Sequence, residues 1–431
     1  MRRAVKSAFR KAGSLTRAAC DLAAGERRGF SLKDGALSHG KGAAVYEGSA
    51  GKYILPSGVE PEALYFLSGT DCFSAAAYAG GQMYVCLTDG GAFASAGVRF
   101  EKAPACVRVY DGEEALVLSD GESVCVFNSD GLTQTEEIPP FSCGGYAYDR
   151  LWLYTGGGDA HRVRFSALRD IYGFGEEGEN YIDFPDGRGE IVAFAELNGA
   201  FYLFRRYGVQ KLDAKGTEDE FSLSDEPAPF TEIYAVCAEN GRAYVLTERG
   251  MYRFGDAQSF YPAFAEKISS AANRNARMAA CGGRIYLAAE FDGEAGLGVF
   301  SEDGKDGFVC PCECAALAVA AAPAGARVLF YRGGDIYAAS EGGSAPAEWK
   351  SGGVSPFGGE ECVLEELALT AEGSFALCVC SERGERSFEI VCRGTKRVRA
   401  ALAGARFRFR VISKGENGKV FSLTAGYSRN A

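Results

Sequence analysis

The sequence predicts an all-β fold built from a repeated unit, a β-propeller of seven or eight blades, and three observations support this prediction. First, a hairpin pattern recurs along the 431 residues, with a Gly-containing turn before a strand rich in aromatic residues. Second, the turn glycines Gly199, Gly241, Gly283 and Gly325 are each 42 residues apart, a period typical of solenoids and propellers. Third, 57 Gly, 29 Phe and 21 Tyr against 13 Pro suit many short strands joined by tight turns.

Residues 1–28 form the first predicted element, a basic N-terminal arm. The arm carries a net charge of about +6, so the rest of the chain carries about −17 to give the formal −11. This asymmetry predicts a basic arm on an acidic body. Two interpretations stay open, a solvated terminus or a surface that docks on an acidic neighbouring subunit or on nucleic acid. The candidate partner-binding cations of the arm are Arg2, Arg3, Lys6, Arg10, Lys11 and Arg17.

The sequence predicts no export signal and no membrane span. The charged start is not followed by an apolar stretch, because Lys and Arg residues interrupt the first 20 positions. No segment reaches the roughly 18 apolar residues that a span requires. We therefore expect a soluble protein made in the cytosol. Its fifteen Cys, an odd number in a large chain, are expected to be reduced and mostly buried in strands.

Residues 29–400 are predicted to form the propeller. One hairpin gives two of the four strands of a blade, so the intervals between hairpins must supply the others. Eight candidate hairpins show strand-like alternation bounded by Gly, Asp or Asn turns, near residues 74–93, 105–127, 145–165, 191–212, 233–254, 278–300, 317–337 and 364–391. Tyr202, Tyr244 and Tyr286, each three residues after its turn glycine, are expected at corresponding positions of successive blades. Residues 265–280 have the composition of a helix.

Residues 401–431 are predicted to form a terminal hairpin that closes or flanks the propeller. Apolar and basic residues alternate strictly in its first strand, which places them on opposite faces. The two faces consist of Phe407, Phe409 and Val411 on one side and Arg406, Arg408 and Arg410 on the other. The basic face is either solvated or turned toward an acidic neighbour. Its three arginines complete the set of candidate partner-binding residues.

The sequence offers little material for catalysis. His39 and His161 are the only histidines, which leaves almost none for His-based catalysis or a multi-His metal site. A G-x-S-x-G nucleophile motif, a phosphate-binding loop and a calcium-loop spacing are all absent. We therefore predict no catalytic residue, no cofactor and no metal ligand.

Two clusters leave an alternative open. Cys310, Cys312 and Cys314 alternate along a strand, but no second Cys or His pair follows at a zinc-site spacing, so free thiols are expected and metal binding is the alternative. Carboxylates gather between residues 176 and 186. They predict an acidic surface loop, and a carboxylate pair for glycoside hydrolysis is the alternative.

Residues 150–212 carry a specific resemblance. They contain a strand ending in Phe165-Ser166, an aromatic loop at 171–174, an Asp-containing turn at 183–187, and the hairpin 202–212 with the sequence YLFRRYGVQKL. This order resembles the propeller segment of tailed-phage virion proteins, in which a W-S or F-S strand precedes an aromatic loop and an L-x-V-F-K-x-x-G-I-x-x-L hairpin. Here the aromatic residue before Ser166 is Phe rather than Trp, and the first 140 residues show no such resemblance.

The resemblance implies a non-enzymatic phage or prophage virion protein of the tail-nozzle or head-to-tail connector type. Its partners would be other virion or tail proteins and further copies of itself, with no membrane and no sequence-specific nucleic acid. Its location would be the virion, after synthesis in the host cytoplasm. An acidic body suits a DNA channel, because negative walls repel phosphates. The alternatives are a cellular propeller that serves as a protein-binding scaffold and a glycan-active propeller enzyme that uses paired carboxylates.

Overall fold

The computed structural model divides the chain into two compact units, residues 42–342 and residues 1–41 with 343–431. The described residues are 15–20, 22, 26–28, 30–33, 36–39, 43–68, 73–157, 161–175, 180–184, 187–215, 217–228, 232–256, 259–260, 268, 271–291, 293–304, 307–311, 314–320, 327–339, 347–414 and 418–429. Among them, no helix is long and apolar enough to cross a membrane.

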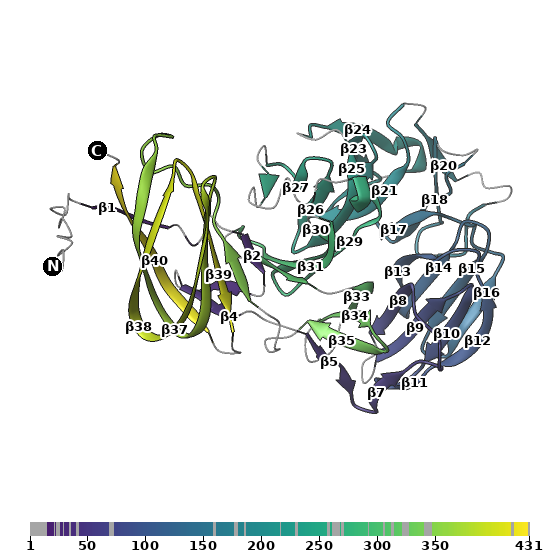
Figure 1. The fold of residues 1–431 in the computed structure, drawn as a ribbon. Helices are drawn as coiled ribbons and strands as arrows, with labels where there is room; N and C mark the ends of the chain where they lie inside the picture. The colour runs from purple at the N-terminus through teal and green to yellow at the C-terminus, as the bar shows by residue number, and fades with distance from the viewer. Residues whose placement is uncertain are drawn as a thin grey trace, which may run out of the picture. The chain divides into compact units, whose positions relative to one another are not determined.

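The described strands of residues 42–342 form a β-propeller of seven four-stranded blades (Figure 1). Each blade is given from its first strand to its outermost strand. Blade 1 consists of β8 (Ala63–Ser68), β9 (Phe73–Ala79), β10 (Gln82–Cys86) and β12 (Ala94–Arg99), and blade 2 consists of β13 (Ala105–Asp111), β14 (Glu113–Ser119), β15 (Val124–Asn128) and β16 (Gly131–Thr135). Blade 3 consists of β17 (Cys143–Ala147), β18 (Arg150–Tyr154), β19 (Arg162–Phe165) and β20 (Tyr181–Asp183), and blade 4 consists of β21 (Ile191–Leu197), β22 (Ala200–Arg205), β23 (Gly208–Asp213) and β24 (Ser222–Glu226).

Blade 5 consists of β25 (Ile233–Glu239), β26 (Arg242–Thr247), β27 (Gly250–Arg253) and β28 (Ser259–Phe260). Blade 6 consists of β29 (Arg277–Cys281), β30 (Arg284–Phe291), β31 (Glu294–Ser301) and β32 (Gly307–Pro311). Blade 7 consists of β33 (Ala315–Ala320), β34 (Arg327–Arg332), β35 (Asp335–Ala339) and β5 (Ala43–Val45). A small sheet is formed by β6 (Glu47–Gly48), β7 (Gly51–Ile54) and β11 (Gly91–Ala92). In the sequence, β6 and β7 precede blade 1, and β11 lies between its last two strands. The sequence-based prediction of a propeller with seven or eight blades is confirmed, and the count is seven.

The ring closes through a strand from the other end of the unit. The first strand of blade 7, β33, contacts the first strand of blade 1, β8. The outermost strand of blade 7 is β5, which pairs antiparallel with β35 and places Val45 opposite Tyr337. The ladder continues at Tyr46, whose N–H donates to the carbonyl of Ile336 at 2.8 Å. The pairing of β5, at residues 43–45, with β35, at residues 335–339, therefore closes the ring.

The first hairpins of blades 4, 5 and 6 show the physical origin of the 42-residue period. Their turns are Asn198-Gly199, Asn240-Gly241 and Gly282-Gly283, with φ values of 52° and 76°, 51° and 71°, and 63° and 72°. Positive φ at both central residues is the type I′ turn, which matches the twist of a two-residue hairpin and favours Asn and Gly. Gly325 lies outside the described residues.

The expected equivalence of the three tyrosines is confirmed. Tyr202, Tyr244 and Tyr286 are each the third residue of a second strand, in β22, β26 and β30. Each lies opposite a small residue of the first strand of its blade. The hairpin repeat therefore sets both the turn and the cross-strand register.

Apolar side chains fill the seams between blades rather than a single centre. Each of seven described clusters draws its residues from two adjacent blades, including blades 7 and 1. At the seam of blades 3 and 4, Trp152 and Phe165 pack with Phe201, and all three are buried. A blade therefore buries its faces only if both neighbours are in place.

The second unit is built from antiparallel strands at both ends of the chain. Its sheet runs β2 (Glu26–Arg28), β36 (Glu348–Lys350), β39 (Phe407–Ser413), β37 (Cys362–Ser381), β40 (Lys419–Arg429), β4 (Ala36–His39) and β3 (Phe30–Lys33), with β38 (Gly384–Gly404) on β37 and β1 (Thr16–Ala19) on β40. One side of β37 pairs with β38 along its whole length. The other side pairs with β40 and then with β39.

The structure corrects the predicted boundaries of the propeller. The sequence predicts that the hairpin at 364–391 belongs to the propeller, but residues 362–381 and 384–404 form two strands of 20 and 21 residues in the second unit. These strands are far longer than the usual three to ten residues. The segment 401–431 is not a hairpin, because β39 and β40 each pair with β37 instead of with each other. Non-local pairing, which no local pattern reports, decides both points.

The basic arm is corrected in the same way. Its residues 16–19 form β1, which pairs with β40, and the carbonyl of Leu22 accepts a hydrogen bond from Trp349 Nε1 at 3.1 Å. The last part of the arm therefore belongs to the second unit. In the segment expected to be helical, Arg277–Cys281 is the first strand of blade 6 and Ala271–Asn275 is a 3-10 helix. Burial at the blade seams overrides helix propensity there.

We predict that the ring depends on β5 in a position-specific manner. Because the Tyr46 N–H points to β35, the N–H of Ala44 points the same way and that of Val45 points outward. Ala44→Pro removes a ladder bond and should destabilise the propeller by about 3 kcal/mol. Val45→Pro is the matched control and should cost much less. Chemical denaturation of both variants, followed by tryptophan fluorescence, provides the measurement, and equal losses would contradict this closure.

Candidate functional site

Of the three predicted arginines, Arg408 and Arg410 lie on the exposed face of β39 and Arg406 is exposed just before this strand, so their alternation is confirmed. Phe407, Phe409 and Val411 are buried between them. Arg410 forms an ion pair with Glu348 of the neighbouring strand β36, so part of this positive charge is neutralised within the unit. Arg17 likewise pairs with Glu366 at 3.0 Å. The other predicted cations, Arg2, Arg3, Lys6, Arg10 and Lys11, lie outside the described residues.

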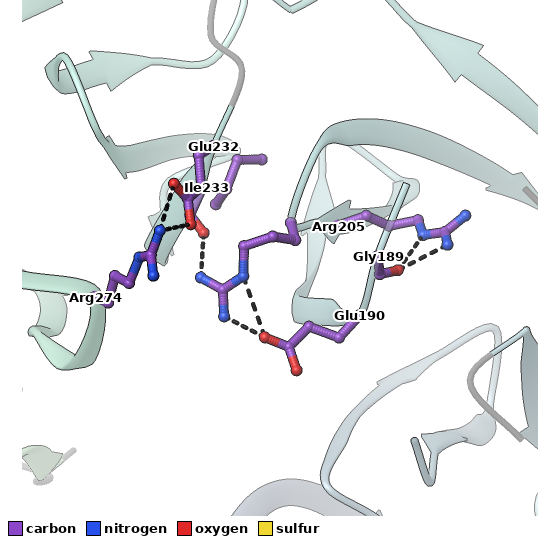
Figure 2. A network of polar contacts seen from close by, with 7 residues as sticks. Gly189, Glu190, Arg205, Glu232, Ile233 and Arg274 are labelled. Atoms are coloured by element: carbon purple, nitrogen blue, oxygen red, sulfur yellow. Dashed lines mark hydrogen bonds and ion pairs between the residues drawn. The ribbon is translucent and has the colours of Figure 1, made fainter. Parts of the chain in front are cut away.

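Charged side chains link neighbouring blades on both faces of the propeller. We call the side with the turns between first and second strands the hairpin face, and the side where first strands begin the entry face. On the entry face, Arg206 donates to Glu190 Oε1 and to the carbonyl of Ile233, the latter at 2.6 Å. Arg274 then donates to Glu232 Oε2 at 3.1 Å (Figure 2). These bonds link blades 4, 5 and 6.

Arg205 is the buried part of this network, with 1% of its surface exposed. Its Nε and Nη2 donate to the carbonyl of Gly189 at 3.1 and 2.7 Å (Figure 2). Its Nη1 donates to Gln210 Oε1 at 3.3 Å. The guanidinium lies 4.5 Å from the ring centre of Phe184, on blade 3. The arginines of the entry face thus tie blades together.

The hairpin face carries a depression of about 540 Å³ between blades 3 and 4. Its lining combines aromatic side chains with charged side chains of both signs, and two hairpin turns, at 148–149 and 198–199, contribute residues to it. Its lining consists of Tyr146, Ala147, Tyr148 and Asp149 of blade 3 and Glu196, Gly199, Ala214 and Lys215 of blade 4.

The turn Tyr148-Asp149 departs from the Asn-Gly or Gly-Gly sequence of the first hairpins of blades 4, 5 and 6. Both residues have φ of 55°, where the equivalent positions of blades 4 and 5 hold Asn-Gly. A left-handed conformation costs an ordinary L-residue roughly 1–2 kcal/mol. Contacts compensate for this strain: the Tyr148 hydroxyl donates to the carbonyl of Leu212 at 3.2 Å, and its ring packs edge-on to Phe201.

A third residue of the same region is also left-handed. Arg169, in the loop between β19 and β20, has φ of 57°. Its Nε donates to Asp149 Oδ2 at 3.0 Å, and its N–H donates to the carbonyl of Asp149 at 2.8 Å. Side chains and backbone therefore fix the loop against the strained turn. Strain that the surroundings maintain in this way is typical of functional sites.

Exposed apolar side chains extend this region toward blade 2. The Tyr146 hydroxyl donates to the carbonyl of Tyr110 at 3.4 Å, and Tyr110 itself is 66% exposed. Leu168 and Tyr172, in the loop that carries Arg169, are also exposed. We define the tyrosine patch as Tyr110, Tyr146, Tyr148, Leu168 and Tyr172. The hairpin pattern predicts the strands at 145–165 but not this patch; its signal in the sequence is the absence of Gly and Asn at Tyr148-Asp149.

The carboxylate cluster predicted at residues 176–186 shows no catalytic arrangement in its described part. Asp183 accepts two hydrogen bonds from Arg162, at 2.8 and 3.2 Å. This hydrogen-bonded arginine lowers the pKa of the Asp183 carboxyl. A general acid for glycoside hydrolysis needs the opposite shift. Glu176, Glu177, Glu179 and Asp186 lie outside the described residues.

Twelve cysteines of the described chain are free thiols, as predicted. Five are buried, six are partly buried, and Cys106 is exposed, so burial is less general than expected. The side chains of Cys310 and Cys312 lie outside the described residues. Within the part of the chain that the structure describes, no three His, Cys, Asp or Glu residues gather as a metal site.

No family model and no curated protein matches this sequence. Solved structures similar to it include the extracellular domain of a candidate one-component system of B. thetaiotaomicron, with TM-score 0.45 and 10% identity over 86% of this chain and 57% of that one. Another is PorZ of the Porphyromonas gingivalis type-IX secretion system, with TM-score 0.40 and 12% identity over 93% and 59%. The Neurospora crassa Pan2 WD40 domain gives 0.44 and 8% over 66% and 89%. The chain thus spans less than two thirds of the first two.

We predict that Arg205 stabilises the propeller more than its neighbour Arg206 does. Arg205→Lys keeps the charge but cannot reproduce the forked bonds to Gly189 or the contact with Phe184, and should cost about 2 kcal/mol. Arg206→Lys, at a partly exposed ion pair, should cost less than about 1 kcal/mol. Urea denaturation of the two variants provides the comparison, and the reverse order would contradict the assigned role.

Proposed function

We propose that this chain is a non-enzymatic protein-binding scaffold that holds a partner protein on the hairpin face of blades 2 to 4. The observation that carries the proposal is the strained turn Tyr148-Asp149 beside the depression. A hairpin with an ordinary Asn-Gly turn would be easier to form, as blades 4 and 5 demonstrate. Keeping a tyrosine there instead is understandable if its ring serves a contact as well as the fold.

The tyrosine patch has the chemistry of a protein interface. Tyrosine gives a large, rigid contact surface with a polar end, and exposed apolar patches mark interaction sites. Glu196 and Lys215 add one charge of each sign at the edge of the depression. Since the patch lies on turns held by packed blades, little conformational entropy is lost when a partner binds.

The resemblance of residues 150–212 adds a setting to this proposal, namely the tail or the head-to-tail connector of a virion. Phe165 and Ser166, which carry the start of the resemblance, are buried, and Ser166 Oγ accepts a hydrogen bond from the N–H of Leu151 at 3.0 Å. These two residues therefore serve the blade itself. Portal, terminase or tail genes beside this gene would support the virion setting, and their absence would leave a cellular scaffold.

A glycan-active propeller is the second candidate, because Asp149 and Glu196 both line the depression. Asp149 is tied to Arg169, so Glu196 is the carboxylate left to act. Glu196→Gln should then abolish hydrolysis of a responsive polysaccharide. The scaffold proposal expects no hydrolysis by either protein.

Site-specific crosslinking tests the scaffold proposal. A photoreactive phenylalanine in place of Tyr110 should give a covalent adduct with one polypeptide in the cells that express the protein. The matched control is Tyr207, which is 54% exposed and lies in the turn after β22, on the entry face. Adducts of equal yield at both positions, or none at Tyr110, would refute the proposed face.

We predict that an ordinary turn can replace the strained one without loss of the fold. The double change Tyr148→Asn and Asp149→Gly should keep stability within about 1 kcal/mol, because relief of strain offsets the lost hydrogen bond to Leu212. It should greatly reduce crosslinking from position 110.

The reverse graft is the control for this prediction. Asn240→Tyr with Gly241→Asp introduces the strain without its supports and should destabilise blade 5. Denaturation curves and adduct yield are the two measurements. Full crosslinking by the protein that carries Tyr148→Asn with Asp149→Gly would show that the turn serves the fold alone.

A further inference from the structure

The strand β38 forms an open edge of the second unit. It pairs with β37 from Gly384 to Gly404, and no described residue forms a backbone hydrogen bond on its other side. The edge is 21 residues long and contains no proline. Bare edges of this kind readily pair with another strand, and native proteins usually shorten or block them.

This edge is strongly bent. Gly394 has φ of 117°, and Gly373, close to it on β37, has φ of 122°. The two ends of the β37–β38 hairpin come together, since Ser381 Oγ donates to the carbonyl of Ala403 at 2.8 Å. The edge therefore has two arms that meet near residues 391–394. A straight strand could pair with only one arm, whereas a strand of the same curvature could follow both.

Charge is separated along the outward-facing residues of the two arms. One arm carries Glu385 and Glu389, and the other carries Arg393, Arg397 and Arg399. Between them lies Val391, an apolar side chain that is 76% exposed. Antiparallel pairing of this edge with itself would place the acidic arm of each copy against the basic arm of the other.

We propose that two copies of this chain associate through their β38 edges, antiparallel, about a two-fold axis at Val391. In this register Glu389 faces Arg393 and Glu385 faces Arg397, each twice, and Ser387 faces Thr395. The two-fold axis lies within three residues of Gly394, where the edge bends, so both arms of each edge lie along the second copy. The partner is thus a strand with the same curvature and the reversed charge order, which β38 itself supplies.

Alternative registers explain less. Moving the axis by one residue to Cys392 retains only the facing of Glu385 and Arg399. Moving it to Arg393 retains only the facing of Glu389 and Arg397 and places the two copies of Arg393 together at the axis. The register centred on Val391 is therefore the one that pairs both glutamates with arginines and puts an apolar side chain at the axis.

One kind of contact opposes this register. On the other face of the strand, it sets Arg386 opposite Lys396, a like-charged pair that the two-fold axis repeats, so two unfavourable contacts stand against four favourable ones. The four outward contacts between opposite charges exceed this opposition. Glu389 also binds Lys414 Nζ at 2.6 Å within its own chain, across β37 and away from the open edge, so its contact with Arg393 of a second copy competes with this ion pair.

Charge reversal tests the pairing directly. The full chain should have the mass of a dimer at micromolar concentration in analytical ultracentrifugation. The variant Glu385→Arg with Glu389→Arg should be monomeric, and so should Arg393→Glu with Arg397→Glu. Mixed in equal amounts, the two variants should restore a dimer. All changed side chains are exposed, and circular dichroism checks that each variant is folded.

The matched control is Glu136→Arg with Glu137→Arg, the same charge change at exposed residues of the propeller. It should leave the dimer intact. A monomeric wild-type chain, a dimer that survives both β38 reversals, or a mixture that stays monomeric would each overturn the proposal. The crosslinking result at Tyr110 is independent of these outcomes, because the tyrosine patch belongs to the other unit.

Discussion

The propeller depends on one constraint, which is that each blade buries its apolar faces only against its two neighbours. Seven seams hold seven apolar clusters, and an open ring would leave two of these faces in water. Closure joins β33 to β8 and completes blade 7 with β5, from residues almost 300 positions earlier in the chain. Only three residues of β5 pair with β35, but this pairing keeps the ring closed and so stabilises every seam. Because each blade is stabilised by its neighbours, the short strand β5 contributes to the stability of the whole propeller.

A ring closed in this way can maintain local strain. The left-handed Tyr148 costs energy in its own hairpin, and the compensating contacts come from blade 4, through Leu212 and Phe201. Arg205 reaches the opposite way, from blade 4 to Phe184 of blade 3. The seam of blades 3 and 4 is therefore tied at both faces. Its rigidity is what holds the tyrosine patch in a fixed arrangement.

Local rules predicted the part of the fold that local chemistry controls. Asn and Gly at turns two residues long, and aromatic residues three positions later, gave the period, the turn type and the equivalence of Tyr202, Tyr244 and Tyr286. The strands β37 and β38 also alternate, so they were taken for a blade. Their true partners include β39 and β40, whose paired residues lie up to 67 positions away, and only tertiary pairing distinguishes these long strands from short blade strands.

The candidate surfaces were harder to predict for a related reason. The turn Tyr148-Asp149 differs from the repeat by its lack of Gly and Asn, and only its backbone shows that it is equivalent to the turns at Asn198 and Asn240. The open edge of β38 has no signature in the sequence, because a sequence does not show which edge of a sheet remains unpaired. By contrast, the arginines of β39 were predicted on the correct face, since alternation alone decides that.

Net charge and local charge act at different ranges in this chain. With a formal charge of −11, two copies repel each other while they are far apart. At physiological ionic strength this repulsion fades beyond a Debye length of about 8 Å, whereas contacts across a shared sheet edge lie well within it. Low salt therefore strengthens both the long-range repulsion and the short-range attraction of Glu389 for Arg393, and high salt weakens both. Self-association through β38 should accordingly be favoured at intermediate ionic strength, where the acidic bodies are screened and the paired arms still attract.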